Sequence, residues 1–221
     1  RGASMVLLAD APGPLEEVLR RVARHIPEAA SVLLFSEVHS AALAMAASLG
    51  LADRTAALHP MGEVAGPGFQ GASPHRFHGR ITYVSAPDTD AGHRTARSAM
   101  SFIEEVLGGA PVLIDPLRHD EQIAWTRQLP GVAMAVLGHL LDGRRLGGVT
   151  WDTAARLARQ GMPVDPVEAS EVILANRVAI GAALEALAGD LDELRRLLLA
   201  GDAVGVRAFF EAAARFRPGT S

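Results

Sequence analysis

A few residues in this chain have side chains that could carry chemistry, although they lie far apart in the sequence. His59 precedes a proline, Arg156 is a single cation among alanines, and Glu37 and Glu63 are carboxylates on either side of His59. A histidine can take up a proton near neutral pH, because its unperturbed pKa lies there. An arginine that faces a pocket can bind an anion. If Glu37 and Glu63 were buried together, one would have a raised pKa and could act as a general acid.

Each of these residues also has an ordinary structural interpretation. Arg156 could be a solvated or surface-paired side chain, and His59 could be a turn histidine before Pro60. Glu37 and Glu63 could be solvated charges, as most exposed carboxylates are. The residues alone therefore leave both interpretations open.

The remaining histidines predict no metal site. His75 and His78 have the spacing His-x-x-His, and His93 and His119 lie further along. No carboxylate or cysteine completes a recognisable ligand pattern around them. His39 and Ser40 lack a third residue that would make a catalytic triad. The chain has no cysteine at all, which excludes disulfides and thiolate ligands.

The composition is that of an ordinary globular protein of 221 residues with a formal net charge of −4. No cluster of lysine and arginine offsets that charge, so we expect no nucleic-acid binding. No apolar run approaches the roughly 18 residues needed to span a membrane. The first four residues are not followed by the apolar segment of a signal peptide, so we expect a cytoplasmic protein.

The first half of the chain alternates apolar runs with amphipathic stretches. Strands are predicted at residues 5–9, 31–35, 80–85 and 111–114, and helices at residues 15–26, 40–49 and 89–107. Strand–helix alternation of this kind is typical of an α/β fold with a mostly parallel sheet.

From residue 117 onward we predict only helices, at residues 120–141, 150–159, 166–188, 191–200 and 203–216. Asp165 is placed as an N-cap before Pro166, Asp190 with Glu193 forms a capping box, and Asp202 caps the last helix. The predicted domains are an α/β domain of residues 1–116 and an all-α domain of residues 117–221.

Several motifs resemble the prephenate/arogenate dehydrogenase family. His59-Pro60-Met61, Asp88-Thr89-Asp90, His119-Asp120 and Leu129-Pro130 match motifs of that family in order. The most specific stretch follows the family pattern in its second domain at Trp151, Asp152, Ala155, Arg156, Leu157, Ala158, Asp165, Pro166, Leu174, Asn176 and Arg177. The resemblance implies a partial Rossmann-like α/β domain followed by a helical C-terminal domain through which the family forms homodimers.

The resemblance also implies roles for particular residues. His59 stands where the family's histidine polarises the substrate hydroxyl, and Arg156 stands where its arginine grips a substrate carboxylate. The family's serine beside that hydroxyl falls on Glu37, with Ser36 adjacent. The family's second histidine falls on Gln128, preceded by Arg127, and its tryptophan falls on Ala169. Gln128 can donate a hydrogen bond but cannot take up a proton at neutral pH.

The glycine-rich turn that holds the family's nucleotide would precede this sequence. A literal G-x-G-x-x-G at Gly66, Gly68 and Gly71 lacks a strand before it and a helix after it, so it is not a phosphate loop. We therefore expect no NAD(P) binding by this chain and no cofactor. The hypothesis is a homodimeric enzyme that acts on a carboxylated cyclic molecule by non-redox isomerisation, elimination, decarboxylation or cyclisation, in aromatic or secondary metabolism.

Two alternatives stay open. The chain could be a noncatalytic relative that binds a ligand or a partner. It could also be a residual prephenate dehydrogenase of tyrosine biosynthesis, completed by another chain that covers the sheet edge at residues 5–9.

Overall fold

A five-stranded sheet forms the first half of the computed structural model, which describes all residues except 1, 10–11, 63–72, 74, 143, 145–148, 162–164 and 216–221. The strands lie in the order β1-β2-β3-β4-β5. Their bounds are Met5–Ala9, Ser31–Phe35, Thr55–Pro60, Ile81–Ser85 and Ala110–Leu113. All neighbours are parallel except β3 and β4, which are antiparallel. The predicted mostly parallel α/β fold is confirmed.

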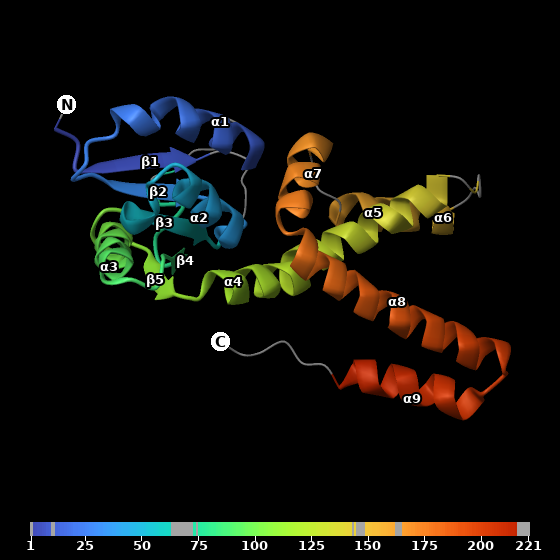
Figure 1. Cartoon of the computed structure of the whole chain (residues 1–221). Helices are drawn as coiled ribbons and strands as arrows, with labels where there is room; N and C mark the ends of the chain where they lie inside the picture. The colour runs from blue at the N-terminus through green and yellow to red at the C-terminus, as the bar shows by residue number, and fades with distance from the viewer. Residues whose placement is uncertain are drawn as a thin grey trace.

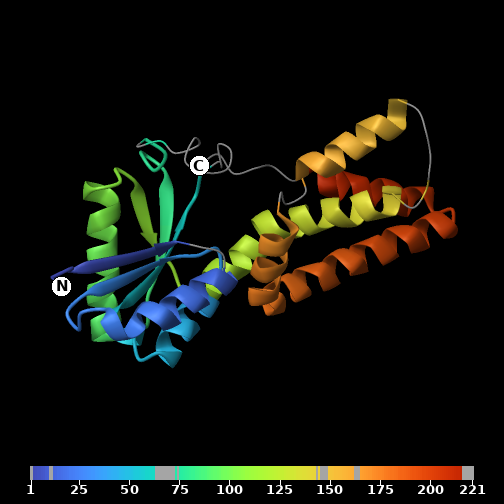
Figure 2. The same cartoon turned by 90° about the horizontal axis from the view of Figure 1, so that it is seen from above.

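Helices cover both faces of this sheet (Figures 1 and 2). On one face lie α1 (Pro12–Val22) and α2 (His39–Ser48), and on the other lies α3 (Asp90–Glu105). Side chains alternate along each strand, so Leu34 packs toward α1 and α2 while Leu33 packs toward α3. Two short 3₁₀ turns, Ala23–His25 and Ala52–Arg54, lead into β2 and β3.

The strand that carries His59 is absent from the predicted elements. β3 has the sequence TAALHP and is buried along almost its whole length. Alanine has a low strand propensity, and a central strand covered on both faces shows no alternation of polar and apolar residues. The strand forms because β2 and β4 provide backbone partners on both sides.

A long helical rod leads away from the sheet (Figures 1 and 2). It consists of α4 (Pro116–Ile123), a π-helical turn (Ala124–Gln128) and α5 (Leu129–Asp142) in direct succession. Asp115 caps α4 by accepting the backbone N–H groups of Leu117 and Arg118. The helix therefore begins four residues before the predicted start at residue 120. Whether residues 1–116 form a separate domain stays a prediction.

The last helices are α6 (Val149–Gly161), α7 (Pro166–Ala175), α8 (Arg177–Leu199) and α9 (Ala203–Ala214). Asp165 and Asp202 cap α7 and α9 as predicted. The predicted single helix at residues 166–188 is wrong, because the chain bends by 94° between α7 and α8. The predicted break near Asp190 is also wrong, since α8 continues to Leu199 and Glu193 instead pairs with Arg196 at 2.6 Å.

Among the described residues, no single helix has the length and apolar character to cross a membrane. The bent pair α7 and α8 passes that test only when both helices are taken together.

Candidate functional site

Polar side chains meet where β2 and β3 end and the helical rod begins. Ser36 and Glu37 directly follow β2, and His59 lies near the end of β3. His119 and Asp120 come from α4, which packs against α2. In open α/β sheets the carboxyl ends of parallel strands are the usual ligand-binding edge.

Asp120 ties the rod to the sheet layer. Its Oδ1 accepts the backbone N–H of His39 at 2.8 Å, and its Oδ2 accepts the N–H of Ser40 at 2.9 Å. These N–H groups belong to the first turn of α2, which has no side-chain cap of its own. A carboxylate from a distant helix therefore serves as the cap. Its negative charge is also stabilised by the positive N-terminal end of the α2 dipole.

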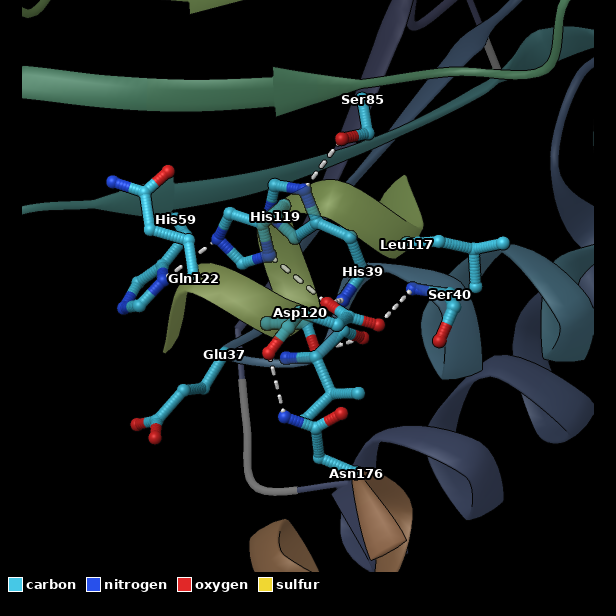
Figure 3. A network of polar contacts seen from close by, with 12 residues as sticks. Glu37, His39, Ser40, His59, Ser85, Leu117, His119, Asp120, Gln122 and Asn176 are labelled. Atoms are coloured by element: carbon cyan, nitrogen blue, oxygen red, sulfur yellow. Dashed lines mark hydrogen bonds and ion pairs between the residues drawn. The ribbon is translucent and has the colours of Figure 1, made fainter. Parts of the chain in front are cut away.

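A line of hydrogen bonds runs from this carboxylate to His59 (Figure 3). His119 Nδ1 lies 2.9 Å from Asp120 Oδ1, and His119 Nε2 lies 3.1 Å from His59 Nδ1. We call these three residues the relay. Because an ionised carboxylate only accepts hydrogen bonds, His119 Nδ1 must carry a hydrogen.

His59 is held in its neutral form. Its exposed fraction is 6%, and burial lowers its pKa to about 3, with the charges of His119 and Arg127 adding to the effect. The pKa near neutrality that was expected for this histidine is therefore wrong, because burial lowers it. The Nδ1 atom of His59 faces His119, and the other edge of the ring points away from the relay (Figure 3).

His39 lies flat against His119. Their ring centroids are 3.6 Å apart and their planes differ by 7°. His39 Nδ1 is 2.7 Å from Ser85 Oγ, which donates to the carbonyl of Ile114, so Nδ1 is the donor to the hydroxyl. Burial lowers the pKa of His39 well below its ordinary value, and the charges of His119 and His59 act in the same direction. The ring is therefore neutral as well.

A second group of polar side chains lies beside the relay. Asn176, at the bend between α7 and α8, donates to the carbonyl of Asp120 at 2.9 Å and to Gln128 Oε1 at 2.8 Å. Gln128 donates to Glu37 Oε1 at 3.4 Å, and Arg127 forms an ion pair with Glu37 Oε2 at 3.3 Å. The π-helical turn is the element that brings Arg127 and Gln128 to Glu37.

These contacts show which side chain after β2 faces the site. The hydroxyl of Ser36 is occupied by the backbone of Val38, donating to its carbonyl and accepting its N–H, each at 3.1 Å. Glu37 instead reaches Arg127 and Gln128. The structure thus brings together His59, Glu37, Arg127 and Gln128 of the predicted residues. Glu63 and the three glycines of the G-x-G-x-x-G lie outside the described residues.

Arg156 forms none of these contacts. It is exposed on α6, which packs on α5. Within the described parts of the chain, no hydrogen bond or ion pair joins it to the relay. Its role as a carboxylate anchor stays a prediction, and Arg127 is the arginine whose charge acts on His59.

Neither His39 nor Ser85 was predicted as a site residue, and no structural role was predicted for Asn176. The His119-Asp120 and Asn176-Arg177 pairs were noted as matches to a family pattern, and His119 was also considered for a metal site. No spacing could have joined His39 to Asp120, because 81 residues separate them.

No group of three or more histidines and carboxylates among the described residues has the arrangement of a metal site. His93, one of the histidines considered for such a site, pairs with Asp88 at 3.1 Å.

Carboxylates contact the first turns of α1 and α2, the helices that follow β1 and β2 in the described part of the chain. The first turn of α2 is taken by Asp120, and the N–H of Gly13 in α1 donates to Glu171 of α7 at 3.3 Å. A phosphate at either place would meet a carboxylate.

The sheet and the site together define the class of this protein: a Rossmann-like, mostly parallel sheet followed by a helical region, with polar residues gathered at the junction. Among solved structures, prephenate dehydrogenase from Aquifex aeolicus matches it with a TM-score of 0.82 and 16% identity, over 96% of this chain and 76% of that one. The same enzyme in complex with hydroxyphenyl propionate and NAD+ gives 0.80 and 17%, over 96% and 74%.

Arogenate dehydrogenase from Synechocystis matches with a TM-score of 0.76 and 19% identity, over 96% of this chain and 77% of that one. No family model and no curated protein matches the sequence. The chain therefore has the fold of prephenate and arogenate dehydrogenases and has diverged far in sequence, which confirms the predicted resemblance at the level of fold.

Proposed function

We propose that this protein binds a carboxylated cyclic small molecule beside His59 and moves a proton at a hydroxyl group of that molecule. The observation that carries the proposal is the relay, which uses His59 Nδ1 and leaves the opposite edge of the ring outside the relay. With the hydrogen between the two rings on His59, the outer nitrogen Nε2 has a lone pair. A neutral imidazole in that state accepts a hydrogen bond or a proton from a hydroxyl.

One group near His59, the guanidinium of Arg127, has a charge that suits a substrate with a carboxylate. Glu37 and the Gln122 amide project to the same side as the His59 ring in Figure 3, and Arg127 pairs with Glu37. Arg127 has 46% of its side chain exposed, so its guanidinium is accessible to an anion. We propose Arg127 as one anchor of the substrate carboxylate, with Arg156 as the anchor that the family resemblance implies.

The first candidate for the reaction is non-redox: isomerisation, elimination, decarboxylation or cyclisation. It is supported by Gln128, which replaces the second histidine of the resembled family. The amide of Gln128 accepts a hydrogen bond from Asn176 and donates one to Glu37. It is also supported by Glu37, which puts a carboxylate where that family has a serine. In this reaction the hydroxyl proton passes to His59, and its electron pair stays on the substrate oxygen.

The second candidate is a nicotinamide-dependent dehydrogenase. It is favoured by the fold, since one of the matching structures is an enzyme of that name solved with NAD+.

The two candidates are separated by incubating the purified protein with prephenate or arogenate, each with and without NAD+ or NADP+, and following product by chromatography. Conversion without nucleotide that is lost in His59→Gln supports the non-redox reaction. Conversion only with nucleotide, accompanied by its reduction, selects the dehydrogenase. Binding without conversion under all conditions overturns both and leaves a ligand-binding relative.

We also propose that the protein is a homodimer through its helical region. Large apolar side chains are more than half exposed along the last helices, among them Leu174, Val178, Leu191, Leu199, Val204 and Phe210. A second copy of the same helices would cover them by a symmetric contact.

A further inference from the structure

One hydrogen lies between His59 and His119, and its position sets the state of both rings. If it is on His59 Nδ1, both rings are neutral and His59 Nε2 has a free lone pair. If it is on His119 Nε2, His119 is a cation, and a neutral His59 carries its own hydrogen on Nε2. The two states differ by one proton, and the same positions of the heavy atoms accommodate both.

We propose that His119 stores the proton that His59 removes from the substrate, so that the positive charge forms beside Asp120 and not on His59. This inference rests on the proposed function and deepens it. The substrate O–H bond breaks and an N–H bond forms at His59 Nε2. The N–H bond at His59 Nδ1 breaks and a new one forms at His119 Nε2. The electron pair of the O–H bond stays on the substrate oxygen.

The ring of His119 is fully buried and has a carboxylate, that of Asp120, as a direct partner. Asp120 contacts its Nδ1 at 2.9 Å, and that carboxylate is held in place by two backbone N–H groups of α2. The stacked ring of His39 is neutral, and the ring of Tyr83 lies edge-on with its centroid 5.5 Å away. Neither of these rings adds a positive charge beside His119.

The surroundings of His59 oppose a cation there. Burial is the largest cause of its low pKa, followed by the charges of His119 and Arg127, and only Asp120 acts in the opposite direction. A histidine that must carry the charge itself would be a poor base with a pKa of about 3. Passing its inner hydrogen to His119 lets it accept a proton while it stays neutral.

His39 is a positioning residue in this arrangement. Its ring lies flat on His119, while its backbone N–H and the Nδ1–H of His119 converge on the same oxygen of Asp120. The hydrogen bond to Ser85 fixes the plane of the His39 ring. His39 on the face of the His119 ring and Asp120 at its edge therefore fix the plane of that ring. The plane in turn fixes the direction in which both ring nitrogens point.

A kinetic test uses His119→Gln in the full chain with the substrate that the protein converts. A glutamine oxygen can accept the Nδ1–H of His59 but cannot store a proton at neutral pH. We expect kcat to fall about 10²-fold or more with KM nearly unchanged, and the acid limb of the kcat profile to move to lower pH. His93→Gln is the matched control, because it makes the same substitution at an exposed histidine that pairs with Asp88 away from the relay. An unchanged acid limb in His119→Gln would overturn the relay.

A second test needs no activity and therefore separates failure of the relay from failure of the proposed function. Nitrogen NMR of labelled histidine rings, assigned with His59→Gln and His119→Gln, follows the relay during acidification from neutral pH. The expected result is that His119 becomes the cation while His59 stays neutral and moves its hydrogen from Nδ1 to Nε2. A cation that forms first on His59, or a His59 that keeps its hydrogen on Nδ1, overturns the proposal.

Discussion

The Nδ1 atom of His59 lies 3.1 Å from the Nε2 atom of His119, and this contact joins the end of β3 to the helical rod. It is the last contact of the relay, which runs from Asp120 through His119 to His59. The opposite edge of the His59 ring takes no part in the relay, and burial keeps the ring neutral.

Replacing His59 by glutamine removes the proposed proton acceptor and keeps a polar side chain of similar size. We expect kcat to fall by about 10²–10⁴-fold, the usual contribution of general acid/base catalysis, with a smaller change in KM. Steady-state kinetics check this, and the melting temperature shows that the fold is kept. His93→Gln is the matched control, because His93 is exposed and pairs with Asp88 away from the relay. Equal activity in the two variants would remove His59 from the mechanism.

The buried histidines predict how stability depends on pH. The pKa values of His39 and His59 are lowered in the folded protein, to about 3 for His59, from an ordinary value of 6.5. At acid pH the unfolded chain therefore binds more protons than the folded one, so stability is fully present above 6.5 and falls below it. The expected slope is about 1.4 kcal/mol for each pH unit and each histidine. Urea titrations at several pH values measure it.

In His59→Gln this slope should be smaller between pH 6.5 and about 3, because one of the two histidines no longer contributes. A slope equal to that of the unmodified protein would show that His59 is not buried as a neutral ring.

Asn176 is expected to be important for stability, because it is buried at the bend between α7 and α8 and makes two hydrogen bonds. Asn176→Ala removes both bonds and leaves the carbonyl of Asp120 and the amide oxygen of Gln128 without this donor. We expect a loss of about 2–3 kcal/mol in the free energy of unfolding. Ser170→Ala, at an exposed position on α7, should change it by less than about 0.5 kcal/mol. Similar values for both variants would contradict the structure at the bend.

The two candidate anchors can be compared directly. Arg127 pairs with Glu37 beside the relay, whereas Arg156 is exposed on α6. We expect Arg127→Met to weaken binding of a carboxylated ligand about tenfold or more, since it removes one charge-assisted contact and leaves Glu37 to repel the anion. Isothermal titration measures the change, and Glu37→Gln in the same background should restore part of it. A loss seen only in Arg156→Met would place the anchor on α6.

The helical region is expected to hold two copies together. Val178 on α8 is 80% exposed in the single chain, so Val178→Glu would put a charge into the proposed contact. Val106, 67% exposed beside the sheet, provides the matched control Val106→Glu. Sedimentation should show a dimer for the unmodified protein and the control, and a monomer for Val178→Glu. A monomeric unmodified protein would contradict the proposal.

Most of the fold could be predicted because its elements have strong local patterns. The strands at residues 5–9 and 31–35 are apolar runs, and Asp165 and Asp202 precede helices as N-caps. β3 could not be found in this way, because its alanines form a strand only between two neighbouring strands. The bend at Asn176 was missed for a related reason: the residues around it fit one helix, and the two long-range bonds of its side chain decide otherwise.

The site was predictable only in part. His59, Glu37, Arg127 and Gln128 were selected from the sequence and do lie together. His39 was not selected, because its neighbours Asp120 and Ser85 are far away in the sequence and neither spacing forms a motif. The low pKa of His59 also depends on burial, which no local pattern reveals.

The most direct measurement is the nitrogen NMR spectrum of the His59 ring in the resting protein at neutral pH. We predict a neutral ring with its hydrogen on Nδ1, bonded to His119, and an unprotonated Nε2. A cationic His59, or a neutral ring with no hydrogen bond to His119, would contradict it.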